Sequence, residues 1–125
     1  MTIQEAIDKI DKLKPNMIPH HQKISWLSDL DGMVWREVYM THEDMPQGIV
    51  YEGYDQDTEP DVHLRVPFPY TNVYQHWLAA KIDDKNRDTN EYTKNMVQFN
   101  NAWDTFTDFW NRTHMPRQAV TQFRL

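Results

Sequence analysis

An aromatic series near the C-terminal end of the chain does most to constrain its fold. Six large side chains recur there at alternating intervals of four and three residues, and no proline or glycine interrupts residues 70–115. They are Tyr92, Met96, Phe99, Trp103, Phe106 and Trp110. This spacing places them on one face of a helix of about five turns, suited to packing against other helices. The pattern predicts a helical bundle with Phe99, Trp103 and Phe106 in its core.

Two further helices are expected before residue 44. Residues 2–5 have the pattern of a capping box for a first helix, which ends before Pro15. Pro19 suits the first turn of a second helix, which we expect over about residues 20–42. Gly32 inside it weakens the helix by about 1 kcal/mol relative to alanine and permits close packing by a neighbour. The apolar positions are Ile24, Leu27, Leu30, Val34 and Val38, flanked by Trp26, Met33, Trp35 and Tyr39.

The middle of the chain, residues 44–70, has a different character. Two of the three glycines and four of the seven prolines fall within it. Apolar and polar residues alternate over residues 48–51 and again over 62–66, which is typical of β-strands. We therefore expect a β-hairpin insertion whose two strands are joined by an acidic loop.

A polar stretch, residues 83–90, separates an apolar face over residues 72–82 from the aromatic series. It could be a tight turn between two helices or the solvated middle of one long helix. Because Asp88 or Thr89 can cap the helix that follows, the turn is favoured. The fourth helix is expected to end near His114, before a proline.

The expected fold class is therefore mainly α, within a single domain of 125 residues. A four-helix bundle with a long C-terminal αα-hairpin occupies residues 1–43 and 71–115. Residues 44–70 form the hairpin insertion, and residues 116–125 form an extended tail.

Charge and composition exclude several classes of protein. The formal net charge is −6 and the 13 basic residues are scattered, which argues against tight capture of nucleic acid. The absence of cysteine excludes disulfides, cysteine-based zinc sites and thiol nucleophiles. No run approaches the ~20 apolar residues needed to span a membrane. The N-terminal residues lack the basic and apolar regions of a signal peptide, so none is expected.

The middle region contains alternating carboxylates that resemble a calcium-binding loop. They are Asp55, Asp57, Glu59 and Asp61. Such a loop needs glycine at the sharp turn and a bidentate glutamate at its twelfth position, where this chain has Pro60 and Val66. The pattern therefore indicates a solvated acidic loop rather than a calcium site.

Histidine spacing gives no metal site. His20 and His21 are adjacent and point in different directions on a helix, whereas ligands on one helical face need a spacing of three or four. His76, with Asp83 or Asp84 farther along the same helix, would make half a site, and no second half is evident. We expect neither a metal nor a cofactor.

No catalytic constellation is evident either. Asp29 and Asp31 flank one leucine on a helix, so they do not share a face as an acid–base pair would. Ser25 and Ser28 lack a nucleophile-elbow context. We expect a protein that is not an enzyme. A helix-turn-helix regulator is disfavoured, because the second helix is too apolar for recognition and the fourth is occupied by its aromatic face.

Seven segments of the sequence carry a resemblance to a known family. They are TIQEAI (2–7), LKPN (13–16), KISWLSDLDG (23–32), GYD (53–55), LRVPFPY (64–70), YxxWLAAKID (74–83) and NRTHMP (111–116). Together they resemble a family of small proteins encoded in the capsid–tail morphogenesis region of tailed phages and Firmicutes prophages. Such proteins look like head–tail connector, or adaptor, subunits.

The resemblance implies a non-enzymatic assembly protein that forms a ring, joins the portal to tail or neck proteins, and makes at most transient, non-specific contact with DNA. It implies residence in the host bacterial cytoplasm during assembly and then in the virion neck, without a membrane. The tail could dock on a partner through Val120, Phe123 and Leu125, and the acidic loop could face the lumen or a neighbour. The alternatives are another packaging or virion accessory protein with a soluble protein-binding role, or a small DNA-binding regulator.

Overall fold

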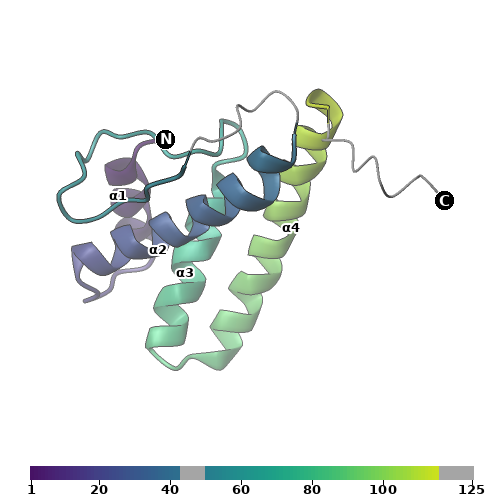
Figure 1. The fold of residues 1–125 in the computed structure, drawn as a ribbon. Coiled ribbons are helices and arrows are strands. Elements are labelled where there is room, and N and C mark those ends of the chain that lie inside the picture. The colour runs from purple at the N-terminus through teal and green to yellow at the C-terminus, as the bar shows by residue number, and fades with distance from the viewer. Residues whose placement is uncertain (43–49, 116–125) are drawn as a thin grey trace.

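The computed structural model describes residues 1–42 and 50–115, and most of them are helical. The α-helices of these ranges are α1 (Ile3–Leu13), α2 (His20–Met33), α3 (Asn72–Lys85) and α4 (Thr89–Thr113). The last two lie side by side as an antiparallel pair, α2 crosses them, and α1 packs against α2 and α3 (Figure 1). The predicted mainly helical fold is confirmed.

The first helix begins as its sequence predicts. The Thr2 side chain accepts a 3.1 Å hydrogen bond from the Glu5 amide, and the Glu5 carboxylate accepts one of 2.9 Å from the Thr2 amide. The two residues thus satisfy backbone donors that a helix N-terminus otherwise leaves without partners. The apolar face of α1 then enters the core through Ile3, Ile7 and Ile10.

The second helical segment follows its predicted course but changes its winding. After Met33 the chain continues as a π-helical turn over Val34–Val38 and a 3₁₀ turn over Tyr39–Thr41. The buried positions of the whole segment include Leu27, Leu30 and Val34, all of which were predicted to be apolar contacts. The π-helical turn was not foreseen. Such turns are rare and frequently occur at functional sites.

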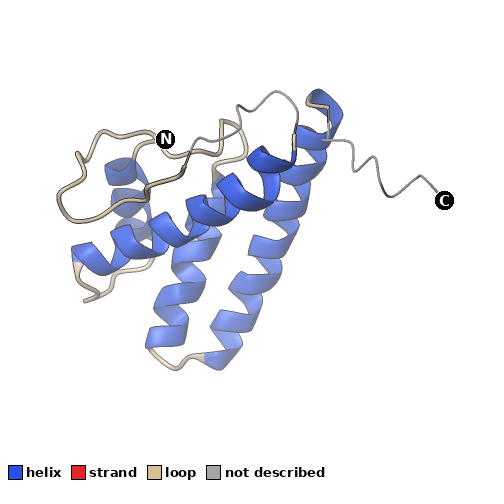
Figure 2. Cartoon of the chain, in the orientation of Figure 1, coloured by secondary structure: helices blue, strands red, loops and turns tan. Residues whose placement is uncertain are grey.

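The predicted β-hairpin is absent from the described residues, in which Figure 2 shows helices and loops but no strand. Residues 48 and 49 of its first strand lie outside those residues. The second strand, residues 62–66, makes only an isolated bridge from His63 to Thr2. Its alternation does place Leu64 and Val66 inside the protein. However, its backbone bonds go to the N-terminal residues and to side chains of α2 and α3, so no strand partner is needed.

The turn between α3 and α4 confirms the favoured interpretation of the polar stretch. Asp88 caps α4, its carboxylate accepting a 3.2 Å hydrogen bond from the Glu91 amide. Arg87 adopts a positive φ of 60° at the reversal of the chain. Within the stretch, Asp83 is buried and forms a 2.8 Å ion pair with Lys14 of the α1–α2 connection.

The aromatic series of α4 is only partly core. Phe99 and Phe106 are buried as predicted, at 4% and 0% exposure. Trp103 is partly buried and packs against the core from its edge, which corrects its predicted place inside it. The reason is that α4 packs against α3 on one side and meets the last turns of the α2 segment only near its C-terminal end. Positions in the middle of α4 that lie beside the α3 contact therefore stay partly open.

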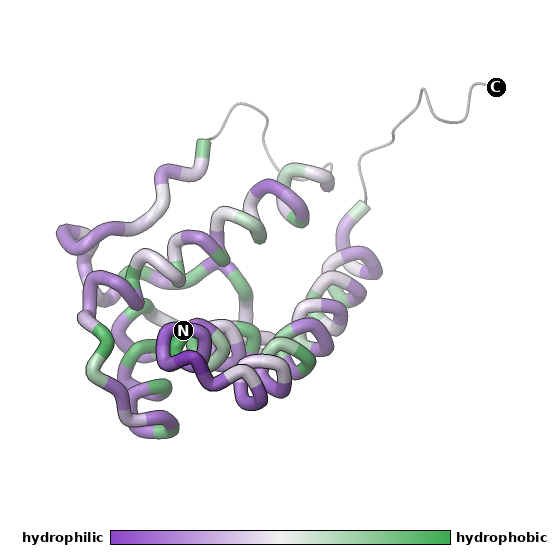
Figure 3. Tube along the Cα trace, turned by 90° about the horizontal axis from the view of Figure 1, so that it is seen from below, coloured by the Kyte–Doolittle hydropathy of each residue, from purple (hydrophilic) through white to green (hydrophobic). Residues whose placement is uncertain are grey.

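Figure 3 shows hydrophobic and hydrophilic residues interspersed along the helices. The tail, residues 116–125, lies outside the described residues.

Candidate functional site

The most unusual group of side chains is centred on Asp31, which is completely buried in α2. One carboxylate oxygen accepts a 2.5 Å hydrogen bond from the Tyr74 hydroxyl. The other accepts bonds of 2.6 Å from the Tyr54 hydroxyl and 2.9 Å from the Arg65 amide. The Tyr39 hydroxyl donates to the Arg65 carbonyl. These contacts, the Asp31 network, join α2, α3 and the loop over residues 50–71.

Burial governs the proton affinities of this network. It raises the pKa of the Asp31 carboxyl, although the tyrosine hydroxyls and the Arg65 amide favour its charged form. Burial and the Asp31 carboxylate also raise the pKa of Tyr54 and Tyr74, so both hydroxyls remain protonated donors. These hydrogen bonds hold the loop against α2 and α3. Because no solvent reaches the Asp31 carboxylate, it is unsuited to acid–base catalysis on a substrate.

This network was not predicted from the sequence. Asp29 and Asp31 were predicted to lie on different faces of the helix, and the structure confirms this, with Asp29 exposed and Asp31 buried. The available signal was the register of the helix. Asp31 follows Leu27 by four residues and Leu30 by one, so it falls on the apolar stripe, where a carboxylate requires buried donors.

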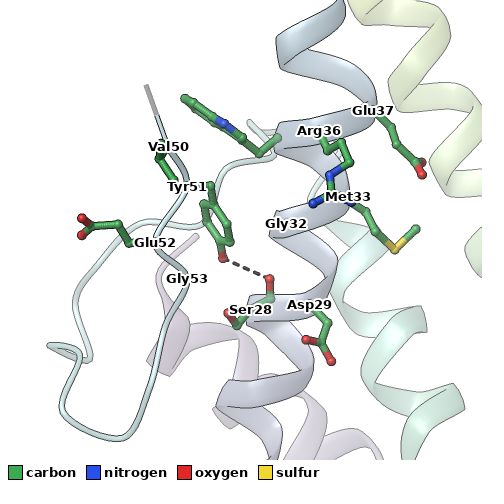
Figure 4. A pocket seen from close by; sticks show the side chains of 11 residues that line it. Ser28, Asp29, Gly32, Met33, Arg36, Glu37, Val50, Tyr51, Glu52 and Gly53 are labelled. Carbon is green, nitrogen blue, oxygen red and sulfur yellow. Dashed lines mark hydrogen bonds between the residues drawn. The ribbon is translucent and has the colours of Figure 1, made fainter. Parts of the chain in front are cut away.

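Next to the network, a groove runs between α2 and the loop segment Val50–Gly53 (Figure 4). Its volume is about 630 Å³, within the range typical of ligand-binding pockets. Its lining residues are Ser28, Asp29, Gly32, Met33, Trp35, Arg36, Glu37, Val50, Tyr51, Glu52 and Gly53. The π-helical turn forms one end of it.

Two glycines shape this groove in different ways. Gly53 has a φ of +79°, and a Cβ there would lie 2.8 Å from the Ser28 hydroxyl oxygen, so glycine is required. The Ser28 hydroxyl in turn accepts a 2.9 Å bond from the Tyr54 amide. Gly32 lies under the Tyr51 ring, as expected of a close-packing glycine, but a Cβ there would sit at an ordinary contact distance of 3.6 Å.

Aromatic and cationic groups fix the loop side of the groove. The Tyr51 hydroxyl donates a 3.0 Å bond to the Ser28 carbonyl, which Figure 4 marks with a dashed line. The Arg65 guanidinium lies 5.2 Å from the centre of the Trp35 ring and 6.0 Å from that of Tyr51. The Arg65 cation thus joins Trp35 of the π-helical turn to Tyr51 of the loop.

The predicted acidic loop is exposed. All four of its carboxylates, Asp55, Asp57, Glu59 and Asp61, face solvent. Within it, Asp55 accepts a 2.8 Å bond from the Asp57 amide, so part of its carboxylate already serves the turn. In the described residues no group of three potential metal ligands is found. The predicted docking residues Val120, Phe123 and Leu125 lie outside those residues.

The histidines considered as metal ligands lie apart from the groove. His20 and His21 are exposed at the start of α2. His76 lines a smaller pocket of about 300 Å³ between α3 and α4, where burial and Lys9 lower its pKa. Asp83 is occupied by Lys14 and by the Asn95 amide, so it offers no second ligand to His76.

The chain matches no family model, no curated protein and no solved structure. Among the helices of the described residues, none is long and apolar enough to cross a bilayer. The candidate site is the groove between α2 and Val50–Gly53, whose lining residues include the carboxylates of Asp29, Glu37 and Glu52.

Proposed function

We propose that this protein is a subunit of the head–tail connector of a tailed phage or prophage. In this role it is a non-enzymatic adaptor that associates with its own copies in a ring and joins the portal to tail or neck proteins. It is made in the host bacterial cytoplasm and ends in the virion neck.

One observation carries the proposal beyond a resemblance of short segments. Four of the resembling segments each contribute one member of the Asp31 network: Asp31, Tyr54, Arg65 and Tyr74. These segments are far apart in sequence and meet at one buried carboxylate. Because satisfying a buried carboxylate needs all of its donors together, a resemblance that includes Asp31 and the three residues that donate to it supports a shared fold.

Surface charge is compatible with a place around passing DNA. The chain carries a net charge of −6, and the carboxylates of the acidic loop project into solvent. We assign these carboxylates to the lumen of the ring or to the face of a neighbouring subunit. A wall of the same sign as the phosphates would let DNA slide without being held.

The experiment that tests this role is deletion of the gene from an inducible phage or prophage that carries it. Electron microscopy of the lysate should then show DNA-filled heads and separate tails that fail to join. The wild-type gene supplied from a plasmid should restore joined particles. Antibodies against the protein should label the neck of the restored virions.

Two results would remove the proposal. The first is a lysate of the deletion strain that contains normally joined, infectious particles. The second is restored particles in which the protein is absent from the neck. Failure to fill heads with DNA, with tails unaffected, would instead support the alternative of a packaging factor.

A further inference from the structure

The loop wall of the groove has an unusual backbone. Among the described residues, the amide and carbonyl groups of Val50, Tyr51, Glu52 and Gly53 have no hydrogen-bond partner, since the bonds of this segment come from the Tyr51 side chain. Val50 is 76% exposed. Free backbone donors and acceptors beside a groove can pair with an added peptide segment.

The groove also selects by charge. Its rims carry three carboxylates, Asp29, Glu37 and Glu52, against a single cation among the lining residues, Arg36. The acidic loop follows directly after the groove in sequence. A peptide that enters should therefore be basic, and it should carry apolar side chains for the apolar part of the groove wall.

The chain itself contains a segment of this description. Residues 116–125 include two arginines, Arg117 and Arg124, and no acidic residue. In an extended conformation Phe123 and Leu125 would fall on one face and Arg124 on the other, because side chains alternate along a strand. One such face would meet the apolar side chains of the groove, those of Met33, Val50 and Tyr51, while the other met the carboxylates at the rim.

We propose that the groove between α2 and Val50–Gly53 receives residues 116–125 of a neighbouring copy, which pair with its free backbone groups. The proposal names the contact that would link subunits in the connector ring, and its choice of a second copy rests on the proposed function. If each subunit places its tail in the groove of the next, the same contact repeats from copy to copy. Such a series closes into a ring when the rotation that relates one subunit to the next divides a full turn evenly.

Reach and geometry favour this exchange. The base of the tail follows α4, whose Trp110 ring lies 4.5 Å from that of Tyr39, near the end of the groove-bearing helical segment. Ten further residues can extend up to about 33 Å, enough to leave the body of one copy and cross to the next. The occupant we assign is a second copy because this contact, repeated from one subunit to the next, would build the ring of the proposed function.

The absence of cysteine makes a direct crosslinking test practicable. One full-length protein carries Val50→Cys and a second, of different size through an added tag, carries Phe123→Cys. The two are mixed and treated with a short thiol crosslinker. The control replaces Val50→Cys by Met17→Cys, because Met17 is 97% exposed and lies away from the groove, between α1 and α2.

The expected result is a crosslinked pair of the two sizes that forms severalfold faster with the Val50→Cys variant than with the Met17→Cys control. Equal rates would overturn the proposal, since accessibility alone would then explain the reaction. A Val50→Cys/Phe123→Cys double variant that crosslinks only within one molecule would also overturn it, and would place a chain's own tail in its groove. Crosslinking of Phe123→Cys to portal protein but never to Val50→Cys would overturn it too, and would assign the tail to the portal.

A charge reversal tests the recognition itself. Arg124→Glu should lower the crosslinking rate by placing a carboxylate beside Glu52, and adding Glu52→Arg to the other protein should restore it. A rate unchanged by both substitutions would contradict the role of charge. This contact and the connector role can fail separately, because crosslinking is measured on purified protein and the neck location on virions.

Discussion

The hydroxyl of Tyr74 on α3 donates a 2.5 Å hydrogen bond to the carboxylate of Asp31 on α2, with both side chains completely buried. The same hydroxyl oxygen accepts a 2.7 Å bond from the Val66 amide. One phenol thus joins two helices to the loop that forms the wall of the groove. The shape of the groove depends on these few polar bonds as well as on apolar packing.

Removing the carboxylate should therefore be costly. We expect Asp31→Ala to lower the free energy of unfolding by about 3 kcal/mol or more, since it empties the site of a buried carboxylate and leaves three donors, the buried Tyr74 hydroxyl among them, without their acceptor. Tyr54→Phe and Tyr74→Phe should each cost about 1–3 kcal/mol. Urea unfolding followed by circular dichroism measures all three. The control is Asp29→Ala, two residues away and outward-facing, which should stay within about 0.5 kcal/mol of wild type.

The raised pKa of Asp31 predicts an unusual dependence of stability on pH. A carboxyl whose pKa is higher in the folded state binds its proton more tightly there, so its contribution is fully present below the unfolded value, here 3.8, and is lost as pH rises through the folded value. The stability of wild type relative to Asp31→Asn should therefore fall as pH increases above 3.8. Urea unfolding of both proteins over a pH series measures this difference. A relative gain by wild type would show that hydrogen bonding outweighs burial.

The two glycines of the groove should respond in opposite directions to the same substitution. Gly53→Ala forces a left-handed residue and a 2.8 Å contact with the Ser28 hydroxyl, and should destabilise the protein by about 1–2 kcal/mol or more. Gly32→Ala meets only an ordinary 3.6 Å contact and should stabilise α2 by up to about 1 kcal/mol. Thermal melting would separate the two. Equal losses would indicate that the Tyr51 ring lies closer to α2 than described.

Within the aromatic face of α4, burial should decide the order of effects. Phe106→Ala, at a position with 0% exposure, should cost about 3–5 kcal/mol. Trp103→Ala should cost less despite the larger side chain, because Trp103 is only partly buried and its loss leaves less of a cavity. Chemical unfolding of both variants measures the two losses in unfolding free energy. A larger loss for Trp103→Ala than for Phe106→Ala would show that Trp103 is the more enclosed ring.

Local rules account for the elements that the sequence predicted correctly. The capping box at Thr2 and Glu5, the stop before Pro15 and the cap at Asp88 act over a few residues, so the helices they delimit were foreseen. The predicted strand over residues 62–66 shows where such rules fail. Its alternation was real, but its partners include Met1, Asp31 and Tyr74, which no local pattern can identify.

The candidate site could be predicted even less. The groove needs the loop over residues 50–54 to lie against α2, and that placement depends on Ser28, whose hydroxyl accepts from the Tyr54 amide and whose carbonyl accepts from Tyr51. A serine on a helix carries no sign of this use. The partly open position of Trp103 likewise depends on which helices face α4, a tertiary fact that periodicity does not contain.

The most direct test of the connector role is a cryo-electron microscopy map of the virion neck from a phage or prophage that encodes this protein. The account predicts a ring of this helical fold between portal and tail, with the segment after α4 of each subunit lying in the α2 groove of the next. A neck whose rings are all built from other proteins would contradict the central claim.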